Sequence, residues 1–475
     1  MSGASSAAPR RVFMATAWLV VNVCASVASA ATGVPHDPRG LWEGKIQSTL
    51  RIIVHVDADS AGALISKVDS PDQGALGLPV SATTFANDTL RLDLSKLGAS
   101  YVGRMAADGA SIEGEWHQSG QLLPLTIARI DSIEPSRRPQ EPRPPYPYAV
   151  EEVRYPGGAE DVSLAGTLTK PQGDGPFPCA LLITGSGPEN RDELVFGHRP
   201  FWIIADDLTR AGIAVLRVDD RGVAGSTGNA GNATSEDFTA DVLAGVKFLA
   251  ARKDIDARRI GLIGHSEGGL IAPLAAARSP QSIAFIVMLA GPGVPGRDIL
   301  DAQGEAIGRA MGVGDKELAE QRRLQHKSFA LMPLKLDSLT LVSRMRAIFR
   351  GEGIDSSKAE SQLSQAVAVA RSPWFRFFID YDPRPALRQV KCPVLALNGS
   401  VDLQVPPRQN LPEIQKALKA GGNRDFETHE LPGLNHLFQN STTGSPAEYG
   451  KIEETFSPAA LKAMREWIVA RMLKP

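Results

Sequence analysis

The feature that most constrains this chain is a serine enclosed by glycines, in the stretch Gly264-His265-Ser266-Glu267-Gly268-Gly269. The apolar residues 260–263 precede it and have the composition of a short buried strand, and apolar residues at helical spacing follow it over 270–275. Ser266 is therefore expected at a strand-to-helix turn. There, a reactive serine adopts a strained backbone, and glycines two positions before and after it relieve crowding between strand and helix. We interpret Ser266 as a nucleophile rather than as part of a plain glycine-rich turn.

Strands and helices alternate over residues 149–475. Near-continuous apolar runs at 179–185, 214–220, 260–265, 283–291 and 394–399 are typical of strands buried on both faces, as in a parallel sheet covered by helices. Helices are expected at 199–211, 235–252, 268–278 and 459–473. The interval from about 294 to 377 breaks the alternation with a helical pattern, and we expect a cap inserted over the sheet.

The preceding part of the chain has a different sequence pattern. Residues 36–133 contain short alternating runs separated by Asp, Asn and Gly turns, which predicts a small antiparallel sheet or partly closed barrel. Residues 134–148, EPSRRPQEPRPPYPY, carry six prolines in fifteen positions and are interpreted as a stiff linker. The predicted fold class is thus α/β: a mostly parallel, doubly wound sheet with a helical cap, preceded by a small antiparallel β domain.

The N-terminus has the pattern of a secretory signal. Two arginines precede an apolar run from Val12 to Val23, and Ala28-Ser29-Ala30 forms a small-residue cleavage motif, so residues 1–30 are interpreted as a signal peptide cleaved after Ala30. The implied location is periplasmic or secreted, and the choice between general and twin-arginine export stays open. An uncleaved membrane anchor is the alternative, although Asn22 makes the run poor for spanning a bilayer.

Composition excludes several classes of partner. Charged residues are 22% of the chain and the net charge is −2, so nothing indicates a nucleic-acid footprint. We expect a small-molecule partner and no stable membrane span after signal cleavage. Oligomeric state is not determined by the sequence.

A serine hydroxyl needs a base, and the base needs an acid that holds its ring. Doubly wound sheets place such groups on loops at the carboxyl ends of strands. Asp402 follows the strand at 394–399 and is the candidate acid, and His436, after the last strand ETHEL, is the candidate base. The chain order Ser266, Asp402, His436 is the one that the nucleophile pattern predicts.

Other residues compete for these roles. His198 is the serious rival base because it follows the loop described next, and Asp219 and Asp220 end another strand, where their alternative role is to hold a turn. The remaining histidines lie in the leading domain, in the cap, within a strand or beside the nucleophile: His36, His55, His117, His326, His429 and His265.

The oxyanion hole needs backbone N–H groups aimed at the developing charge. Glu267, directly after the nucleophile, supplies the first amide, and the loop TGSGPENRDE at 184–193 supplies the second. Ser186 is our choice in that loop, with Gly187 next. Arg191 and Asp192 are expected to form an ion pair that shapes the loop.

The motifs TGSGPENRDE, DDRGVAGSTG, GHSEGG, YDPRPAL, NGSVDLQVPP and GLNHLFQ occur in this order. Together they resemble the α/β-hydrolase superfamily and, within it, EstD-type carboxylesterases, which also carry a leading β domain. The resemblance extends over essentially the whole mature chain. It implies Ser266, Asp402 and His436 as catalytic triad, the assignment that the residues themselves support. Thr184 departs from the histidine that many hydrolases carry at this position.

These features predict a serine carboxylesterase that acts on a small-molecule ester through an acyl-enzyme and requires no metal or organic cofactor. Two alternatives remain. A serine peptidase or amidase of the same fold would need cap carboxylates such as Glu305, Glu317 or Glu320 to hold a peptide ammonium. A catalytically silent envelope-binding protein would act through its β domain.

Overall fold

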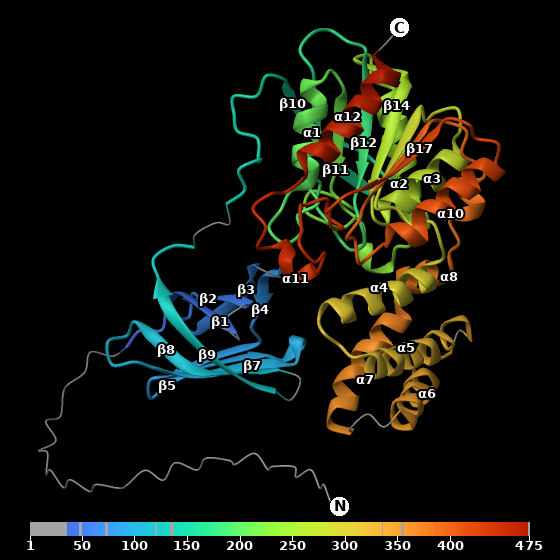
Figure 1. The fold of residues 1–475 in the computed structure, drawn as a ribbon. Helices are drawn as coiled ribbons and strands as arrows, with labels where there is room; N and C mark the ends of the chain where they lie inside the picture. The colour runs from blue at the N-terminus through green and yellow to red at the C-terminus, as the bar shows by residue number, and fades with distance from the viewer. Residues whose placement is uncertain are drawn as a thin grey trace, which may run out of the picture. The chain divides into compact units, whose positions relative to one another are not determined.

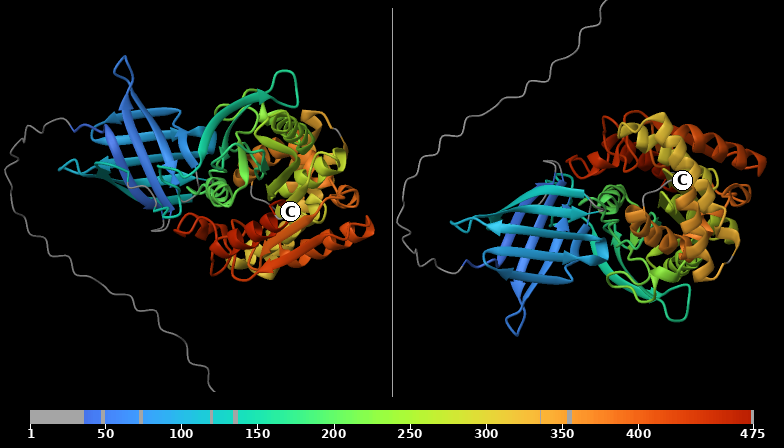
Figure 2. Two further views of the ribbon diagram at one scale, coloured as in Figure 1. Left: turned by 90° about the horizontal axis from the view of Figure 1, so that it is seen from above. Right: turned by 90° about the horizontal axis from the view of Figure 1, so that it is seen from below.

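The computed structural model describes residues 36–46, 50–71, 75–118, 121–133, 137–334, 336–352 and 356–473. Two β-sheets organise this part of the chain (Figures 1 and 2). The predicted signal peptide lies outside the described residues. No helix among them is long and apolar enough to cross a membrane.

The first sheet is antiparallel throughout, with its nine strands in the order β4-β3-β2-β1-β9-β8-β7-β6-β5. Burial alternates along its strands, as in β6, because successive side chains point to opposite faces. Trp42, Tyr101 and Trp116 pack in its apolar core, and the Tyr101 hydroxyl donates to the carbonyl of Ile112. The predicted antiparallel β domain is confirmed. Its strands are β1 (Gly40–Ile46), β2 (Leu50–Ala58), β3 (Leu64–Ser70), β4 (Ala75–Pro79), β5 (Ala82–Ala86), β6 (Thr89–Leu94), β7 (Ala99–Met105), β8 (Ser111–Gln118) and β9 (Gln121–Ile130).

The second sheet has eight strands in the order β10-β11-β13-β12-β14-β15-β16-β17. The strands from β13 to β17 pair in parallel, and β10 and β11 add an antiparallel edge. In chain order the strands are β10 (Ala149–Pro156), β11 (Ser163–Lys170), β12 (Phe177–Ile183), β13 (Ala214–Val218), β14 (Ile255–His265), β15 (Phe285–Leu289), β16 (Val394–Gly399) and β17 (Phe426–Leu431).

Helices cover both faces of this sheet, which makes it doubly wound as predicted. One apolar core contains residues of α2 (Ser235–Ala250), α3 (Gly268–Arg278) and α10 (Pro407–Ala420). A second core, on the other face, contains residues of α1 (Pro200–Arg210) and α12 (Pro458–Met472). A single-turn helix, α11 (Pro446–Tyr449), lies between β17 and α12. Strands with both faces in these cores have the continuous apolar sequences from which they were predicted.

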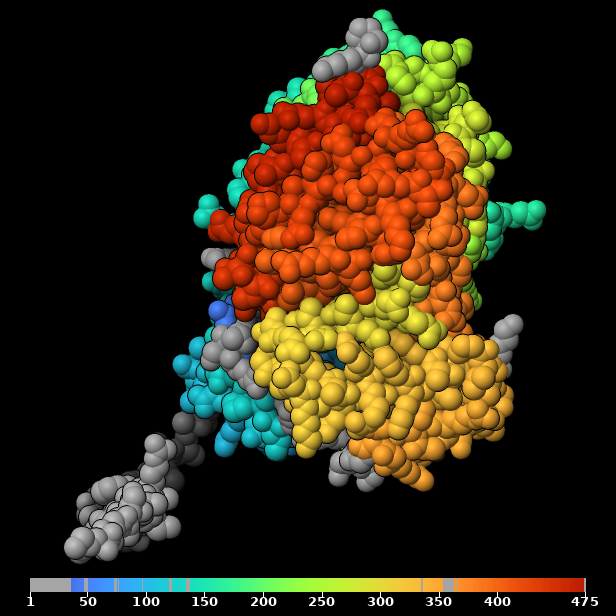
Figure 3. Space-filling view, turned by 45° about the vertical axis from the view of Figure 1, so that its right-hand side comes forward, coloured from blue at the N-terminus to red at the C-terminus, as the bar shows by residue number. Residues whose placement is uncertain are grey.

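The predicted cap is a set of helices between β15 and β16. In its described residues it contains no strand, and its helices are α4 (Gly296–Ala310), α5 (Asp315–Phe329), α6 (Ser338–Gly351), α7 (Ser356–Arg371), α8 (Pro373–Asp380) and α9 (Arg384–Leu387). Phe329, Met345 and Phe349 are buried between them. The surface is hollowed between α4 and α5, drawn in yellow in Figure 3.

Residues 137–148, the described part of the predicted linker, bind to the second sheet's helices and loops. Besides the carbonyl of its neighbour Arg137, the Arg138 guanidinium donates to four carbonyls of the second-sheet part, those of Phe196, Gly197, Gly450 and Ile452. The Gln140 side chain accepts from the amide of Thr455 at 2.6 Å, and the Tyr148 hydroxyl donates to Asp206 at 2.7 Å. The division at 36–133, 134–148 and 149–475, with a cap at about 294–377, stays a prediction.

Candidate active site

Ser266 lies where β14 ends and α3 begins, and its φ of 52° is in the left-handed region that non-glycine residues rarely adopt. A Cβ on Gly264 would lie 2.0 Å from the carbonyl oxygen of Gly268, and one on Gly268 would lie 2.2 Å from that of Ile183. Only glycines fit at these two positions. This is the crowding between strand and helix that the sequence predicts.

Asp402 and His436 lie on the loops after β16 and β17, and the structure brings them together. Nδ1 of His436 is 2.9 Å from Oδ2 of Asp402. The other carboxylate oxygen of Asp402 accepts from the amides of Gln404 and Val405, at 2.8 and 2.9 Å. Both side chains are buried. The carboxylate is therefore held by two amides and in turn orients the imidazole, with Nε2 left for chemistry.

His265 connects the turn at Ser266 to the loop of His436. Its ring centroid is 4.9 Å from that of His436, and its Nε2 donates to the His436 carbonyl oxygen at 2.9 Å. Its Nδ1 is 2.8 Å from Oε1 of Glu193, which also accepts from the Gly185 amide at 3.0 Å. Burial alone would lower the pKa of His265, but the charge and hydrogen bond of Glu193 outweigh it and raise that pKa above its ordinary value. An acceptor at each ring nitrogen fixes the orientation of the His265 ring.

The predicted oxyanion loop lies beside Ser266, since a Cβ on Gly185 would be 3.4 Å from the Cβ of Ser266. The amide of Gly185 is engaged by Glu193, and that of Glu189 by Asp220. In the described part of the chain, no hydrogen bond engages the amides of Ser186 or Glu267. These two N–H groups therefore remain available to a ligand.

Asp219 and Asp220 hold the oxyanion loop through hydrogen bonds. Asp219 accepts from the backbone amide of Arg191 at 2.8 Å and pairs with its guanidinium at 2.7 Å. Asp220 accepts from the Thr184 hydroxyl at 2.8 Å. The predicted ion pair between Arg191 and Asp192 is wrong. Both side chains find partners on neighbouring strands: Arg191 binds Asp219 and Glu152, and Asp192 binds Arg217.

The rival base His198 is fully buried away from this cluster. Its Nδ1 lies 2.9 Å from the hydroxyl of Thr455, and its Nε2 lies 2.9 Å from the carbonyl oxygen of Tyr449. Burial lowers the pKa of His198 to about 4, so the ring is neutral at physiological pH. His198 ties together loops of the fold and has no contact with Ser266 or His436 in the structure.

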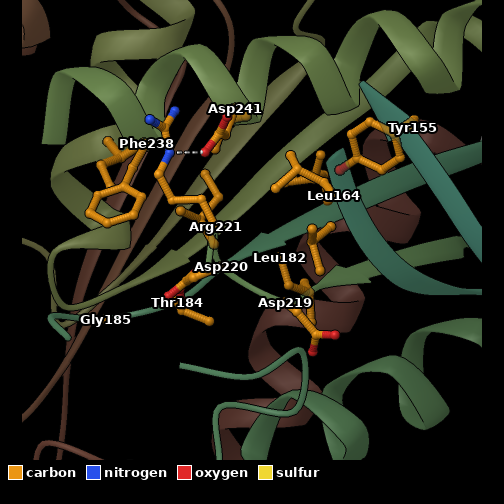
Figure 4. A pocket seen from close by; sticks show the side chains of 15 residues that line it. Tyr155, Leu164, Leu182, Thr184, Gly185, Asp219, Asp220, Arg221, Phe238 and Asp241 are labelled. Atoms are coloured by element: carbon orange, nitrogen blue, oxygen red, sulfur yellow. Dashed lines mark hydrogen bonds and ion pairs between the residues drawn. The ribbon is translucent and has the colours of Figure 1, made fainter. Parts of the chain in front are cut away.

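Buried carboxyl groups surround the oxyanion loop, and their environment was not foreseen from the sequence. Burial raises the pKa of Asp220 to about 7 and raises that of Glu189 well above its usual range. The Asp220 side chain also borders a small cavity, shown in Figure 4, which Thr184 and Gly185 line from the loop. Apolar side chains such as Leu164 and Phe238 complete that cavity.

The Glu267 side chain is a further element that sequence reasoning missed. Its Oε1 accepts from the Ser235 hydroxyl at 2.5 Å, and its Oε2 accepts from the indole N–H of Trp374 at 2.8 Å. The Trp374 ring stacks on Phe378, with centroids 5.2 Å apart. Among the described residues, no group of three or more His, Cys, Asp or Glu could hold a metal ion.

The mostly parallel sheet with helices on both faces, and the cluster at its carboxyl edge, define an α/β hydrolase. The sequence profile described as the alpha/beta hydrolase family matches residues 180–449, more than half of the chain, and the chain belongs to this family.

Particular relatives extend the comparison. Esterase EstD of Thermotoga maritima is 25% identical over 289 residues, which cover 61% of this chain and 61% of the relative, so the chain spans less than two thirds of that protein's length. An esterase of Pyrococcus furiosus is similar in structure, with 16% identity, a TM-score of 0.43, and coverage of 72% of this chain and all of that one. A proline iminopeptidase of Mycobacterium smegmatis has 17% identity and a TM-score of 0.43, over 68% of this chain and 99% of that one.

Proposed function

We propose that this protein is a serine carboxylesterase that works through an acyl-enzyme intermediate. The observation that carries the proposal is the buried hydrogen bond between His436 and Asp402, on loops that meet beside the strained turn at Ser266. A base held by an acid next to a backbone-strained serine is the arrangement that activates a hydroxyl.

In the proposed reaction, Nε2 of His436 removes the Ser266 proton as Oγ attacks the ester carbonyl. Asp402 keeps Nδ1–H in place and stabilises the imidazolium that forms. The amides of Ser186 and Glu267 donate to the oxyanion of the tetrahedral intermediate. The imidazolium gives its proton to the leaving alkoxide. Water, deprotonated by the same histidine, then hydrolyses the acyl-enzyme and restores Ser266.

The similarity to esterase EstD supports an ester as the substrate. The cap carboxylate Glu305 is bound by Arg309 and Arg322 on the exposed surface of α4 and α5, so its charge is already compensated. A peptide ammonium would need an uncompensated carboxylate. This contact disfavours Glu305 as the group that would hold a peptide ammonium.

The test is a rate panel of p-nitrophenyl esters with acyl chains of two to twelve carbons, measured beside aminoacyl p-nitroanilides. We expect ester hydrolysis to dominate, to be abolished in Ser266→Ala, and to be blocked by a fluorophosphonate that labels Ser266 in peptide mass spectrometry. Predominant anilide cleavage would replace the esterase with a peptidase. Absence of both activities and of labelling in the folded protein would leave the silent envelope-binding alternative.

We also propose that the protein is exported and cleaved after Ala30. The arginines, the apolar run and the Ala28-Ser29-Ala30 motif support this proposal. Intact mass measurement of the protein from a periplasmic fraction tests it. A mature chain that begins at Ala31 is expected, and a full-length chain retained in the membrane fraction would indicate an uncleaved anchor.

A further inference from the structure

The carboxylate of Glu267 is buried without a cationic partner. Glu267 is 2% exposed, and in the described part of the chain no cationic side chain acts on its carboxylate. Two neutral donors bind it instead, the hydroxyl of Ser235 and the indole N–H of Trp374. Burial raises the pKa of the Glu267 carboxyl group, and the nearby Ser186 side chain acts with these two donors to lower it. Burying a carboxylate costs free energy unless hydrogen-bond donors satisfy it. Loss of one donor also weakens the hydrogen bonds that the remaining donors make.

These three side chains come from three separate elements. Ser235 opens α2, Trp374 lies on α8 of the cap, and Ser186 lies in the oxyanion loop. The carboxylate therefore joins the cap to the turn that carries the nucleophile. It also lies near the side chain of Ser186, and the amides of Ser186 and Glu267 form the proposed oxyanion hole.

We propose that Glu267 is a positioning residue for the oxyanion hole and that Trp374 couples the cap to it. The inference rests on the proposed function. The hydrogen bonds from Ser235 and Trp374 fix the position of residue 267 relative to the loop of Ser186, and the bond from α8 makes that position depend on the placement of the cap. Donor position matters because oxyanion donors act only when they are aimed at the developing charge.

The test compares two tryptophan variants. Trp374→Phe removes the N–H that Glu267 accepts and keeps the aromatic ring. Trp467→Phe on α12 is the matched control, because its indole N–H is buried with no hydrogen-bond partner among the described residues. We expect Trp374→Phe to lower kcat for a small acetate ester about 10- to 100-fold with little change in KM, and Trp467→Phe to leave kcat within twofold.

A second readout separates positioning from a general structural role. Replacing the ester carbonyl oxygen by sulfur weakens hydrogen bonding to the hole, so the ratio of ester to thionoester kcat reports on its donors. We expect this ratio to fall in Trp374→Phe and in Glu267→Ala, and to be largely restored in Glu267→Gln, whose amide oxygen can still accept from the indole. An unchanged ratio in a folded Trp374→Phe protein would overturn the inference. So would an unchanged ratio in Glu267→Ala if Trp374→Phe does not fold.

Failure of this inference is distinguishable from failure of the proposed function. If Ser266→Ala is inactive while Trp374→Phe matches Trp467→Phe in kcat and in the ratio, the esterase stands and the coupling through Glu267 is wrong. If Ser266→Ala retains esterase activity, the assignment of Ser266 as nucleophile is wrong. The proposed oxyanion hole, which is defined relative to Ser266, is then wrong as well.

Discussion

The backbone carbonyl of His436 accepts a hydrogen bond from Nε2 of His265, the residue that directly precedes the nucleophile, at 2.9 Å. The loop that carries the proposed base is thus bonded to the turn that carries the proposed nucleophile. Glu193 binds the other ring nitrogen and extends the connection to the oxyanion loop through Gly185. The buried ring of His265 therefore joins three parts of the site.

Two substitutions at His265 separate its two contacts. The amide nitrogen of Gln can take the place of Nε2 and keep the bond to the His436 carbonyl, whereas that of Asn takes the place of Nδ1 and keeps only the bond to Glu193. We expect His265→Asn to lower kcat by about 10- to 100-fold and His265→Gln by less, because only Asn releases the loop of the base. Steady-state kinetics on one ester checks the order. The reverse order would mean that the contact with Glu193 matters more.

The assignment of the acid is tested by a pair of aspartates. Asp402→Asn should preserve folding and lower kcat by about 10³- to 10⁴-fold, since an amide favours the wrong imidazole tautomer. Asp219→Asn should instead lower the free energy of unfolding by about 2–4 kcal/mol, because the Arg191 guanidinium loses its buried partner. Kinetics and urea unfolding of both variants give the comparison. Near-normal turnover in Asp402→Asn, with turnover lost in a stable Asp219→Asn, would make the acid assignment wrong.

Asp219 and Asp220 are neighbours whose pKa values shift in opposite directions. Burial raises the pKa of Asp220 from 3.8 to about 7. Burial alone would also raise the pKa of Asp219, but the hydrogen bonds from Arg191 outweigh it and lower that pKa. The contribution of Asp220 to stability is therefore full below pH 3.8 and is lost as the pH rises through about 7. The contribution of Asp219 to stability is full above the pKa of Asp219 in the unfolded chain. It is lost as the pH falls through the lowered pKa of Asp219 in the folded protein.

The free energy of unfolding, measured at two pH values, checks the directions of these two pKa shifts. Asn mimics the protonated form of Asp220, so Asp220→Asn should be more stable than the wild type at pH ~8 by about 1–2 kcal/mol, and nearly equal to it at pH ~4. This size is below the full value for the shift because the titration of Asp220 is coupled to those of Glu189, Glu193 and Glu267. Asp219→Asn should be less stable than the wild type at pH ~8. Equal pH profiles for wild type and Asp220→Asn would contradict the raised pKa.

Local patterns predicted much of this molecule because they act over a few residues. The glycines around Ser266 and the continuous apolar runs follow from crowding and burial at one element, and the carboxyl ends of parallel strands place Asp402 and His436 on one edge. The contact of Trp374 with Glu267 joins residues 107 positions apart, and no local periodicity encodes it. The partner of Arg191 was missed for the same reason. The hairpin of β10 and β11 was also missed, because its alternating edge strand lacks the apolar run of a buried one.

Arg138 gives the proline-rich segment a role beyond that of a spacer. It donates to the carbonyls of Phe196, Gly197, Gly450 and Ile452, and its removal leaves these part-buried acceptors without a donor. Arg138→Ala should lower the free energy of unfolding of the second-sheet part by about 2–3 kcal/mol without changing kcat, because no proposed reacting group contacts it. Thermal unfolding beside steady-state kinetics provides the measurement.

The same contacts set where the chain can be shortened. All proposed reacting groups and both oxyanion amides lie after residue 148, so a chain that begins at Arg137 should fold, label with a fluorophosphonate at Ser266 and hydrolyse a small activated ester. A chain that begins at Tyr148 should also label, but it lacks Arg138 and Gln140 and should unfold at a lower temperature. Loss of activity on bulky esters alone, in both shortened chains, would assign substrate access to the first sheet. Loss of labelling in the chain from Arg137, shown by circular dichroism to be folded, would mean that the first sheet shapes the active site itself.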